Sequence, residues 1–236
     1  MILFQILSGI GYSLCSSTLL LLNKGSLQYL PYGSLLSIIQ FVISIIIILI
    51  IDFLGYDKID RLEWKKVKYY LKYVILFIFT IYSNMKSLTT VNVETVIVFR
   101  SCSPIAVSII EYLLLNRSFP SFKSLVSLIG VAAAAVVYWI SDSQLKLEGL
   151  SAYSWVLIYF VLITTEMTYG KVIISSVKMD SIWGSVYYCA VLSLPLLLLI
   201  ELFEGNLNNK LLAITSIPTT GWLVIGTSSI FAALIG

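Results

Sequence analysis

The dominant pattern along the chain is a series of long apolar stretches separated by short polar segments. An α-helix needs about 20 mostly apolar residues to cross a hydrocarbon layer of ~30 Å, and these stretches have about that length. The third is the least apolar, because Lys72 lies in its first turn and has to extend toward the membrane surface. The pattern predicts eight membrane-spanning helices, at Ile2–Leu22, Ser34–Leu54, Tyr69–Met85, Val93–Leu115, Phe122–Ile140, Tyr153–Lys171, Trp183–Phe203 and Gly221–Gly236.

Composition supports an all-α, polytopic membrane fold. The chain is 59% hydrophobic and 11% charged, with a mean hydropathy of +0.98. It has no histidine, and its cysteines (Cys15, Cys102 and Cys189) stand singly within apolar stretches, without zinc spacing or a disulfide framework. We therefore expect no metal, no cofactor and no nucleic-acid partner. A membrane-embedded enzyme is also not expected, since no cluster of acids or histidines lies near a helix end.

The loops alternate in charge, which predicts an orientation. Three loops on one side hold ten basic residues, and the opposite loops hold Lys24, Lys86, Lys146 and Lys210. Because positive loops stay in the cytoplasm, this places the N-terminus in the cytosol. Asn116-Arg-Ser118 matches the N-glycosylation pattern but falls on the cytosolic side, so we predict that it is unmodified. The N-terminus enters an apolar stretch directly, and we expect no removable signal peptide. The ten basic residues are Lys58, Arg61, Lys65, Lys66, Lys68, Lys72, Arg117, Lys123, Lys171 and Lys178.

A weak internal repeat predicts two related halves. Leu21–Gly25 is similar to Thr168–Val172, and Ile50–Gly55 is similar to Leu199–Gly205. An odd number of spans separates the copies, so the second unit enters the membrane from the opposite side. Inverted repeats of this kind are typical of secondary transporters. We therefore predict a first five-helix repeat over 1–140 and an incomplete second repeat over 141–236, with chance similarity between helix ends as the alternative.

The fourth predicted span carries polar residues on one face. Arg100, Ser103, Pro104, Ser108 and Glu111 are three or four residues apart, which places them on one side of a helix. A charge at this depth costs at least ~2.5–3.5 kcal/mol, so Arg100 is expected to face a polar cavity or a neighbouring helix rather than lipid. Two roles stay open: a structural ion pair with another helix, or contact with an anionic substrate.

Several of these residues resemble a known family. Tyr12 followed by Asn23-Lys24 is similar to the first helix of nucleotide-sugar transporters, in the drug/metabolite transporter superfamily, and Gln40 follows as it often does there. Ser83–Glu94 is similar to the family's link between helices three and four. Val96–Pro104 resembles its GDP-sugar branch, typified by GDP-mannose transporters.

The resemblance implies a fold and an activity. Members of the family have ten helices in two inverted halves, and they exchange a cytosolic nucleotide sugar for a luminal nucleoside monophosphate. It implies a multi-pass protein of the Golgi membrane, which often forms homodimers. By the same resemblance this chain holds helices one to eight, and helices nine and ten are absent together with the family's Gly-x-x-Asn-Lys motif. A truncated chain without transport activity is therefore one interpretation.

The resemblance also suggests residues that bind substrate. In helix seven, GDP-mannose transporters carry Phe-Tyr-Asn-Asn, where this chain has Val186-Tyr-Tyr-Cys189, so only Tyr187 agrees and the guanine-recognising amides are missing. The two tyrosines stack on a base or sugar, or else pack within the bundle. Lys24 and Lys171 lie at the ends of repeat-related helices. They either contact an anionic substrate or extend to the membrane surface. The predicted substrate-binding residues are Tyr12, Asn23, Lys24, Arg100, Lys171, Tyr187 and Tyr188.

Two other functions stay open. An organellar triose-phosphate or phosphoenolpyruvate exchanger of the same superfamily relies on basic residues in helices that this chain does not hold. A non-transporting fragment that regulates a full-length transporter is an alternative of a different class.

Overall fold

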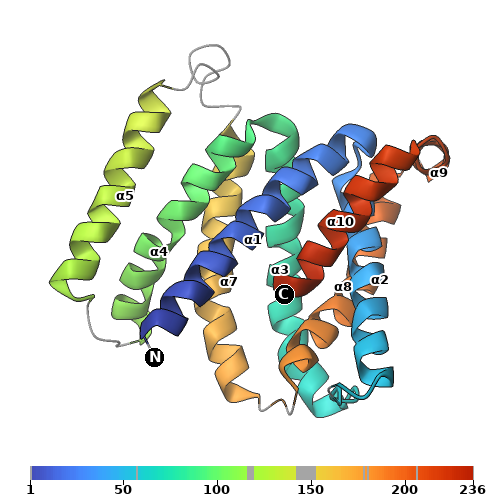
Figure 1. Cartoon of the computed structure of the whole chain (residues 1–236), viewed down its shortest axis with the longest axis horizontal. Helices are drawn as coiled ribbons and strands as arrows, with labels where there is room; N and C mark the ends of the chain where they lie inside the picture. The colour runs from blue at the N-terminus through green and yellow to red at the C-terminus, as the bar shows by residue number, and fades with distance from the viewer. Residues whose placement is uncertain are drawn as a thin grey trace. The chain divides into compact units, whose positions relative to one another are not determined.

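The structure is a computed structural model that describes residues 2–56, 58–115, 120–141, 153–177, 179, 181–205 and 207–235. All regular secondary structure in these ranges is helical, which confirms the predicted fold class. The helices are α1 (Ile2–Tyr29), α2 (Gly33–Phe53), α3 (Trp64–Thr90), α4 (Val93–Leu115), α5 (Phe122–Ser141), α7 (Ser154–Ser176), α8 (Ile182–Glu204), α9 (Leu207–Thr215) and α10 (Thr219–Ile235) (Figure 1).

Each predicted span coincides with a helix, although not every helix is apolar enough to pass as a span by itself. Helix α3 falls short because lysines at both ends and several tyrosines dilute its apolar centre. Helix α9 was not predicted, and it joins α10 through a bend of 103° that makes the pair one candidate broken span. Among the described residues, the helices long and apolar enough to cross a membrane contain Gly33–Phe53, Val93–Leu113, Ser154–Ile173 and Trp183–Glu204.

Some sequence predictions fall outside the described residues. The glycosylation pattern at Asn116 lies there, and so do Arg117 and Lys178 of the predicted cytosolic loops. Their placement stays a prediction.

The described helices form two compact units. The first contains residues 1–78 and 177–236, and the second contains residues 79–176, so the boundary falls within α3 and after α7. These units are defined by contacts, whereas the predicted repeats at 1–140 and 141–236 are defined by sequence similarity. The repeat boundary therefore stays a prediction.

In the first unit, α10 packs against both α1 and α2, and α2 packs against α8 (Figure 1). The side chains of Leu36, Ile48, Leu197 and Ile225 are buried completely at these contacts. Apolar side chains also join α3 to α8, where Val74 and Ile78 pack with Leu197. Burial at these helix contacts stabilises the unit through close packing, since lipid is as apolar as the helix surfaces themselves.

In the second unit, α4 packs against α5 and α7. The Phe99 ring on α4 lies 6.2 Å from that of Tyr153 and 6.4 Å from that of Phe160, measured between ring centroids. Thr95 and Tyr138 share a hydrogen bond of 3.0 Å that joins α4 to α5. The helix that carries Arg100 is therefore held on two sides by aromatic packing and a hydroxyl pair.

Candidate functional site

A buried cluster of neutral polar side chains joins three helices of the first unit. We call it the amide cluster: Asn23 and Ser26 of α1, Gln40 of α2 and Ser228 of α10, each at most 6% exposed. Gln40 Nε2 donates to Asn23 Oδ1 at 2.8 Å and to Ser228 Oγ at 3.0 Å. Ser26 Oγ donates to Ser228 Oγ at 3.4 Å. The two N–H groups of Gln40 are both used, so its amide fixes α1 and α10 against α2.

The hydrogen bonds of the amide cluster can be tested by replacing Gln40. Replacing Gln40 with Met removes both donated bonds and leaves Asn23 Oδ1 without this donor in an apolar interior. We expect a loss of roughly 1–3 kcal/mol of stability, the usual cost of an unsatisfied buried group. The measurement is the midpoint of thermal unfolding in detergent. The double variant Gln40→Met/Asn23→Leu is the control and should recover part of the loss; equal or larger destabilisation would contradict this assignment.

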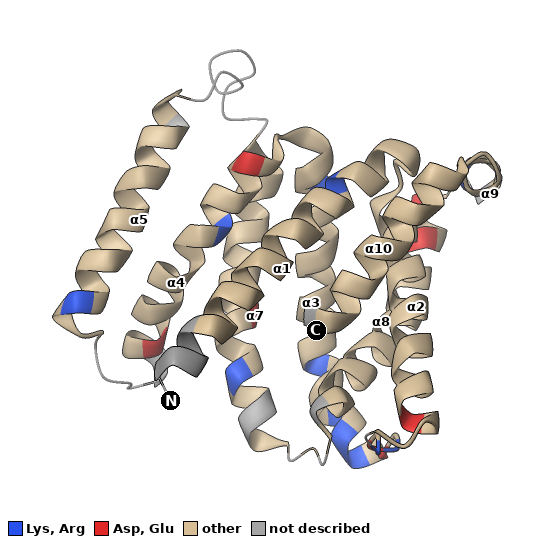
Figure 2. Ribbon diagram, viewed as in Figure 1, with Lys and Arg blue, Asp and Glu red and all other residues tan. Residues whose placement is uncertain are grey.

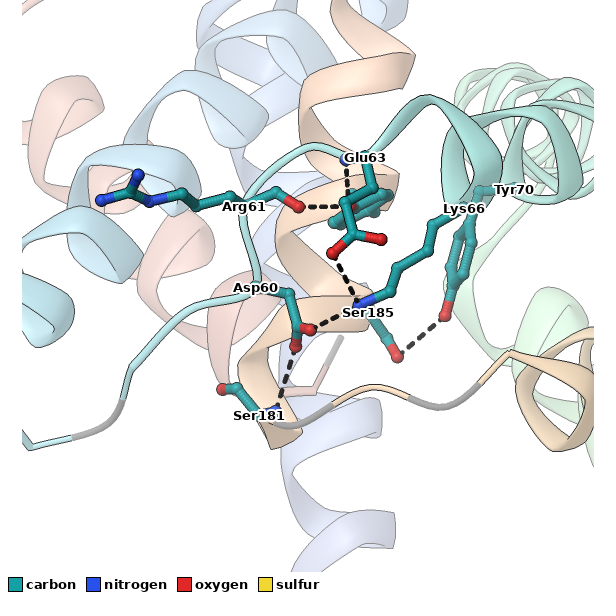
Figure 3. A network of polar contacts seen from close by, with 8 residues as sticks. Asp60, Arg61, Glu63, Lys66, Tyr70, Ser181 and Ser185 are labelled. Atoms are coloured by element: carbon teal, nitrogen blue, oxygen red, sulfur yellow. Dashed lines mark hydrogen bonds and ion pairs between the residues drawn. The ribbon is translucent and has the colours of Figure 1, made fainter.

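A second polar network ties the segment before α3 to the start of α8 (Figure 3). We call it the Asp60 network, because the carboxylate of Asp60 lies at its centre with only 2% of its side chain exposed. Asp60 Oδ1 lies 2.8 Å from Lys66 Nζ, and Asp60 Oδ2 accepts the Ser181 N–H at 3.1 Å. Ser181 is the residue that caps α8, and its own hydroxyl accepts the Trp183 N–H at 3.1 Å. Asp60 therefore places a negative charge at the positive end of α8.

The same network accounts for Tyr188. Its hydroxyl donates to the carbonyl oxygen of Arg61 at 2.5 Å and accepts the Glu63 N–H at 2.8 Å, and the residue is fully buried. Its ring packs against that of Tyr70, whose hydroxyl shares a hydrogen bond of 3.0 Å with Ser185. Both contacts of the Tyr188 hydroxyl are internal, so in this structure it holds the loop before α3.

Asp60 also fixes the charge state of Lys66, which lies in the first turn of α3, before the predicted span. The hydrogen bond and negative charge of Asp60 raise the pKa of Lys66 above its ordinary value of 10.5. A raised pKa in the folded state means that the stabilisation is fully present below the unfolded pKa. It is lost only as pH rises through the folded value. The pair therefore stays intact throughout the neutral range.

The opposite end of the first unit holds a buried charged cluster, which consists of Glu201 and Glu204 of α8 with Lys210 of α9. Lys210 Nζ lies 2.6 Å from Glu201 Oε1 and 3.1 Å from Glu204 Oε2, and its side chain is 5% exposed. Ser34 Oγ donates to Glu204 Oε2 at 3.0 Å, and the Tyr32 ring centroid lies 5.5 Å from the ammonium. The cluster fixes α9 to the end of α8 and to the start of α2.

The polar face of α4 has a partner within the second unit. Glu111 Oε1 lies 2.7 Å from Lys171 Nζ of α7, and Lys171 is 47% exposed. Arg100 is partly buried on the same helix. Ser103 is 1% exposed, and its hydroxyl has no hydrogen-bond partner among the described residues. Glu111 of this face thus forms an ion pair with α7, and the two roles considered for Arg100 stay open.

The remaining predicted residues lie in the first unit. Tyr12 is 55% exposed on α1, about 16 Å along the helix from the buried Asn23 and on nearly the same side. Lys24 and Tyr187 are partly buried. The structure brings Asn23 together with Gln40, and it places Tyr187 and Tyr188 on different sides of α8.

Sequence reasoning missed Ser228 and Asp60 as network members. The last apolar stretch contains a Thr-Ser-Ser run, which is a signal for a polar helix face, but the pattern does not identify its partner. Asp60 lies in a loop rich in basic residues, and no motif there singles it out. Gly184, in the first turn of α8, was the available sequence signal for a close contact at this position. In the structure, an added Cβ there would lie 2.6 Å from Asp60 Oδ2.

Comparison with known proteins agrees with the predicted resemblance. "GDP-fucose transporter 1" of Arabidopsis thaliana is 38% identical over 185 residues, which are 78% of this chain and 53% of that protein. "GDP-mannose transporter GONST3" of Arabidopsis thaliana is 31% identical over 95% of this chain and 60% of its own length. "UDP-galactose/UDP-glucose transporter 7" is 22% identical over 88% of this chain and 62% of that protein.

The chain spans between half and two thirds of the length of these curated relatives. Residues 3–139 match the EamA-like transporter family, which is more than half of the 236 residues. The protein therefore belongs to the EamA-like transporter family.

Proposed function

We propose that this chain takes part in moving a GDP-sugar from the cytosol into the Golgi lumen in exchange for a nucleoside monophosphate. The similarity to "GDP-fucose transporter 1" over 78% of the chain is the observation that carries the proposal. The similarity to "GDP-mannose transporter GONST3" supports the same class of substrate. The whole activity is a proposal for this chain, since it spans 53% and 60% of those two proteins.

The chemistry of the described residues supports such a substrate. A nucleoside diphosphate sugar carries about two negative charges, and crossing an apolar region requires protein cations and hydrogen-bond donors to replace water. Arg100 supplies a guanidinium in the first half of α4, and guanidinium groups bind phosphate oxygens through two parallel hydrogen bonds. The hydroxyl of Ser103 lies one turn further along the same helix. We assign Arg100 to the diphosphate.

Base recognition is assigned to fewer residues than the tyrosine pair suggested. Tyr188 is buried, with both hydroxyl contacts internal, whereas Tyr187 is partly buried on α8. We propose that Tyr187 stacks on the base or sugar. Tyr188 supports it by holding the loop that precedes α3. Asn23 is also buried, with its Oδ1 accepting from Gln40, so we propose that it supports the site by fixing α1 against α2.

Counterflow in liposomes tests the proposed exchange. The purified full chain is reconstituted, the vesicles are loaded with GMP, and uptake of radiolabelled GDP-fucose and GDP-mannose is compared with that of UDP-galactose. We expect uptake of a GDP-sugar that depends on internal GMP. Uptake of UDP-galactose alone would overturn the base assignment, exchange of phosphoenolpyruvate or triose phosphate would favour a phosphate exchanger, and no exchange with any substrate would overturn transport by this chain.

The role of Arg100 gives a specific prediction. Arg100→Gln removes one charge-assisted contact, which contributes ~1.5–3 kcal/mol, so the KM for the GDP-sugar should rise about tenfold or more. Arg100→Lys keeps the charge but not the bidentate geometry, so its KM should lie between that of the unmodified chain and that of Arg100→Gln. Lys123→Gln, at the exposed start of α5, is the control for the loss of one positive charge. An unchanged KM in Arg100→Gln at equal reconstituted protein would contradict the assignment.

A further inference from the structure

Exposed aromatic and basic residues occur together in the segment where α2 ends and α3 begins. Figure 2 shows Lys and Arg positions gathered at this end of the unit. The aromatic residues are strongly exposed: Tyr56 by 83%, Trp64 by 72% and Tyr69 by 59%. Tyrosine and tryptophan are enriched at the boundary between hydrocarbon and water, because one end of each ring system is apolar and the other is polar. We call the whole region the basic–aromatic surface, formed by Tyr56, Lys58, Arg61, Trp64, Lys65, Lys68, Tyr69 and Lys72.

The lysines of α3 in this surface share one side of the helix. Lys65, Lys68 and Lys72 are three and four residues apart, so their side chains follow one another along a single face. All three are exposed, and the salt bridges found among the described residues include none of them. Lys66, on a different side, is the lysine that Asp60 engages. The exposed face therefore keeps its positive charge.

Nearby acids offset this charge only in part. Asp60 is buried and is matched by Lys66. Asp52 Oδ1 accepts the Ile59 N–H at 3.1 Å, and Glu63 Oε1 lies 3.8 Å from Lys66 Nζ. Asp57 lies outside the described residues. The segment from 52 to 72 contains six basic and four acidic residues, so it retains a net positive charge.

We propose that the basic–aromatic surface binds the anionic phospholipid headgroups of the leaflet in which α3 begins. Clusters of four to eight basic residues next to a membrane helix attract anionic headgroups, and the attraction falls off within a Debye length. The aromatic rings set the depth at which this end of the unit lies in the membrane, while the lysine face of α3 lies at the level of the headgroups. At the other end of the same unit, Lys210 is buried between Glu201 and Glu204, so that cation is directed inward. This inference does not depend on the proposed substrate.

Lipid-dependent stabilisation of the purified full chain tests this proposal. The thermal unfolding midpoint is measured in a nonionic detergent with increasing phosphatidylserine or phosphatidylcholine, because a ligand that binds the folded state raises the midpoint. We expect phosphatidylserine to raise the midpoint at far lower concentration than phosphatidylcholine. The difference should shrink in 1 M salt, where the Debye length is about 3 Å.

Variants on the lysine face separate this surface from general membrane affinity. Lys65→Gln/Lys68→Gln/Lys72→Gln should bind phosphatidylserine roughly a hundredfold more weakly, about fivefold for each lysine. The triple change to arginine keeps the charge and should retain binding, and Lys123→Gln on α5 should also retain it. Equal response of the glutamine triple variant and the unmodified chain would overturn the proposal. An equal response to inorganic phosphate would also overturn it, since that would indicate a site for free anions.

Discussion

Lys210→Met is expected to lower the free energy of unfolding by about 3–5 kcal/mol. The side chains of Lys210 and Glu201 are each 5% exposed, and the ammonium lies within 3.1 Å of two carboxylates. Methionine is similar in length but carries no charge, so the variant leaves Glu201 and Glu204 close together without their cation. Removing one member of a buried ion pair costs about this much, because the remaining charge is desolvated.

The measurement is thermal unfolding in detergent, followed with a thiol-reactive fluorophore that reports exposure of the partly buried cysteines Cys15, Cys102 and Cys189. For a chain of this size, a loss of 4 kcal/mol corresponds to a midpoint lower by roughly 10 °C. The double variant Glu201→Gln/Lys210→Met also neutralises the more buried of the two acids and should regain part of the loss. If the double variant is as unstable as the sum of the two single variants, the carboxylate and ammonium do not interact as described.

Helix α9 shows what an apolar pattern does not predict. The long helices follow from apolar stretches of about 20 residues, and the structure has a helix at each of them. Residues Leu207–Thr215 form a helix of only nine residues that includes two asparagines and a lysine, so no apolar stretch announces it. Its position depends on the pair between Lys210 and two acids of α8. Such a contact is tertiary, and the local sequence gives no information on it.

The candidate site shows the same limit. Asn23 and Gln40 were singled out from a motif in adjacent helices, whereas Ser228 is 188 residues from the Gln40 that it accepts from. Tyr188 was selected as one of a tyrosine pair, because sequence shows the type of side chain and not its partners. Its hydroxyl is taken up by backbone groups of Arg61 and Glu63, more than 120 positions earlier in the chain. Residue type thus indicated where polar chemistry lies, and the fold decided which groups remain available to a substrate.

Asp60→Ala should be the second most damaging substitution, at about 3 kcal/mol. It removes the buried carboxylate that pairs with Lys66 and that accepts the Ser181 N–H at the start of α8. Loss of a buried ion pair accounts for most of the effect, reduced because the Lys66 side chain is 18% exposed and can reach water. Loss of the acceptor for the buried Ser181 N–H adds about 1 kcal/mol. The unfolding midpoint in detergent measures the result, and Asp60→Asn should lie between the variant and the unmodified chain because it keeps an acceptor.

Gly184→Ala tests the same contact from the other helix. A Cβ at position 184 would lie 2.6 Å from Asp60 Oδ2, so the carboxylate has to move away from Lys66 and Ser181, and we expect a loss of about 2 kcal/mol. Gly226→Ala on α10 is the matched control: an added Cβ there meets nothing within 4 Å, so alanine should stabilise the helix by roughly 0.5–1 kcal/mol. In the Asp60→Ala background, Gly184→Ala should cost little, because the atom it displaces is gone. Full additivity of the two changes would contradict the assignment, because it would show that the cost of alanine at 184 does not come from displacing Asp60.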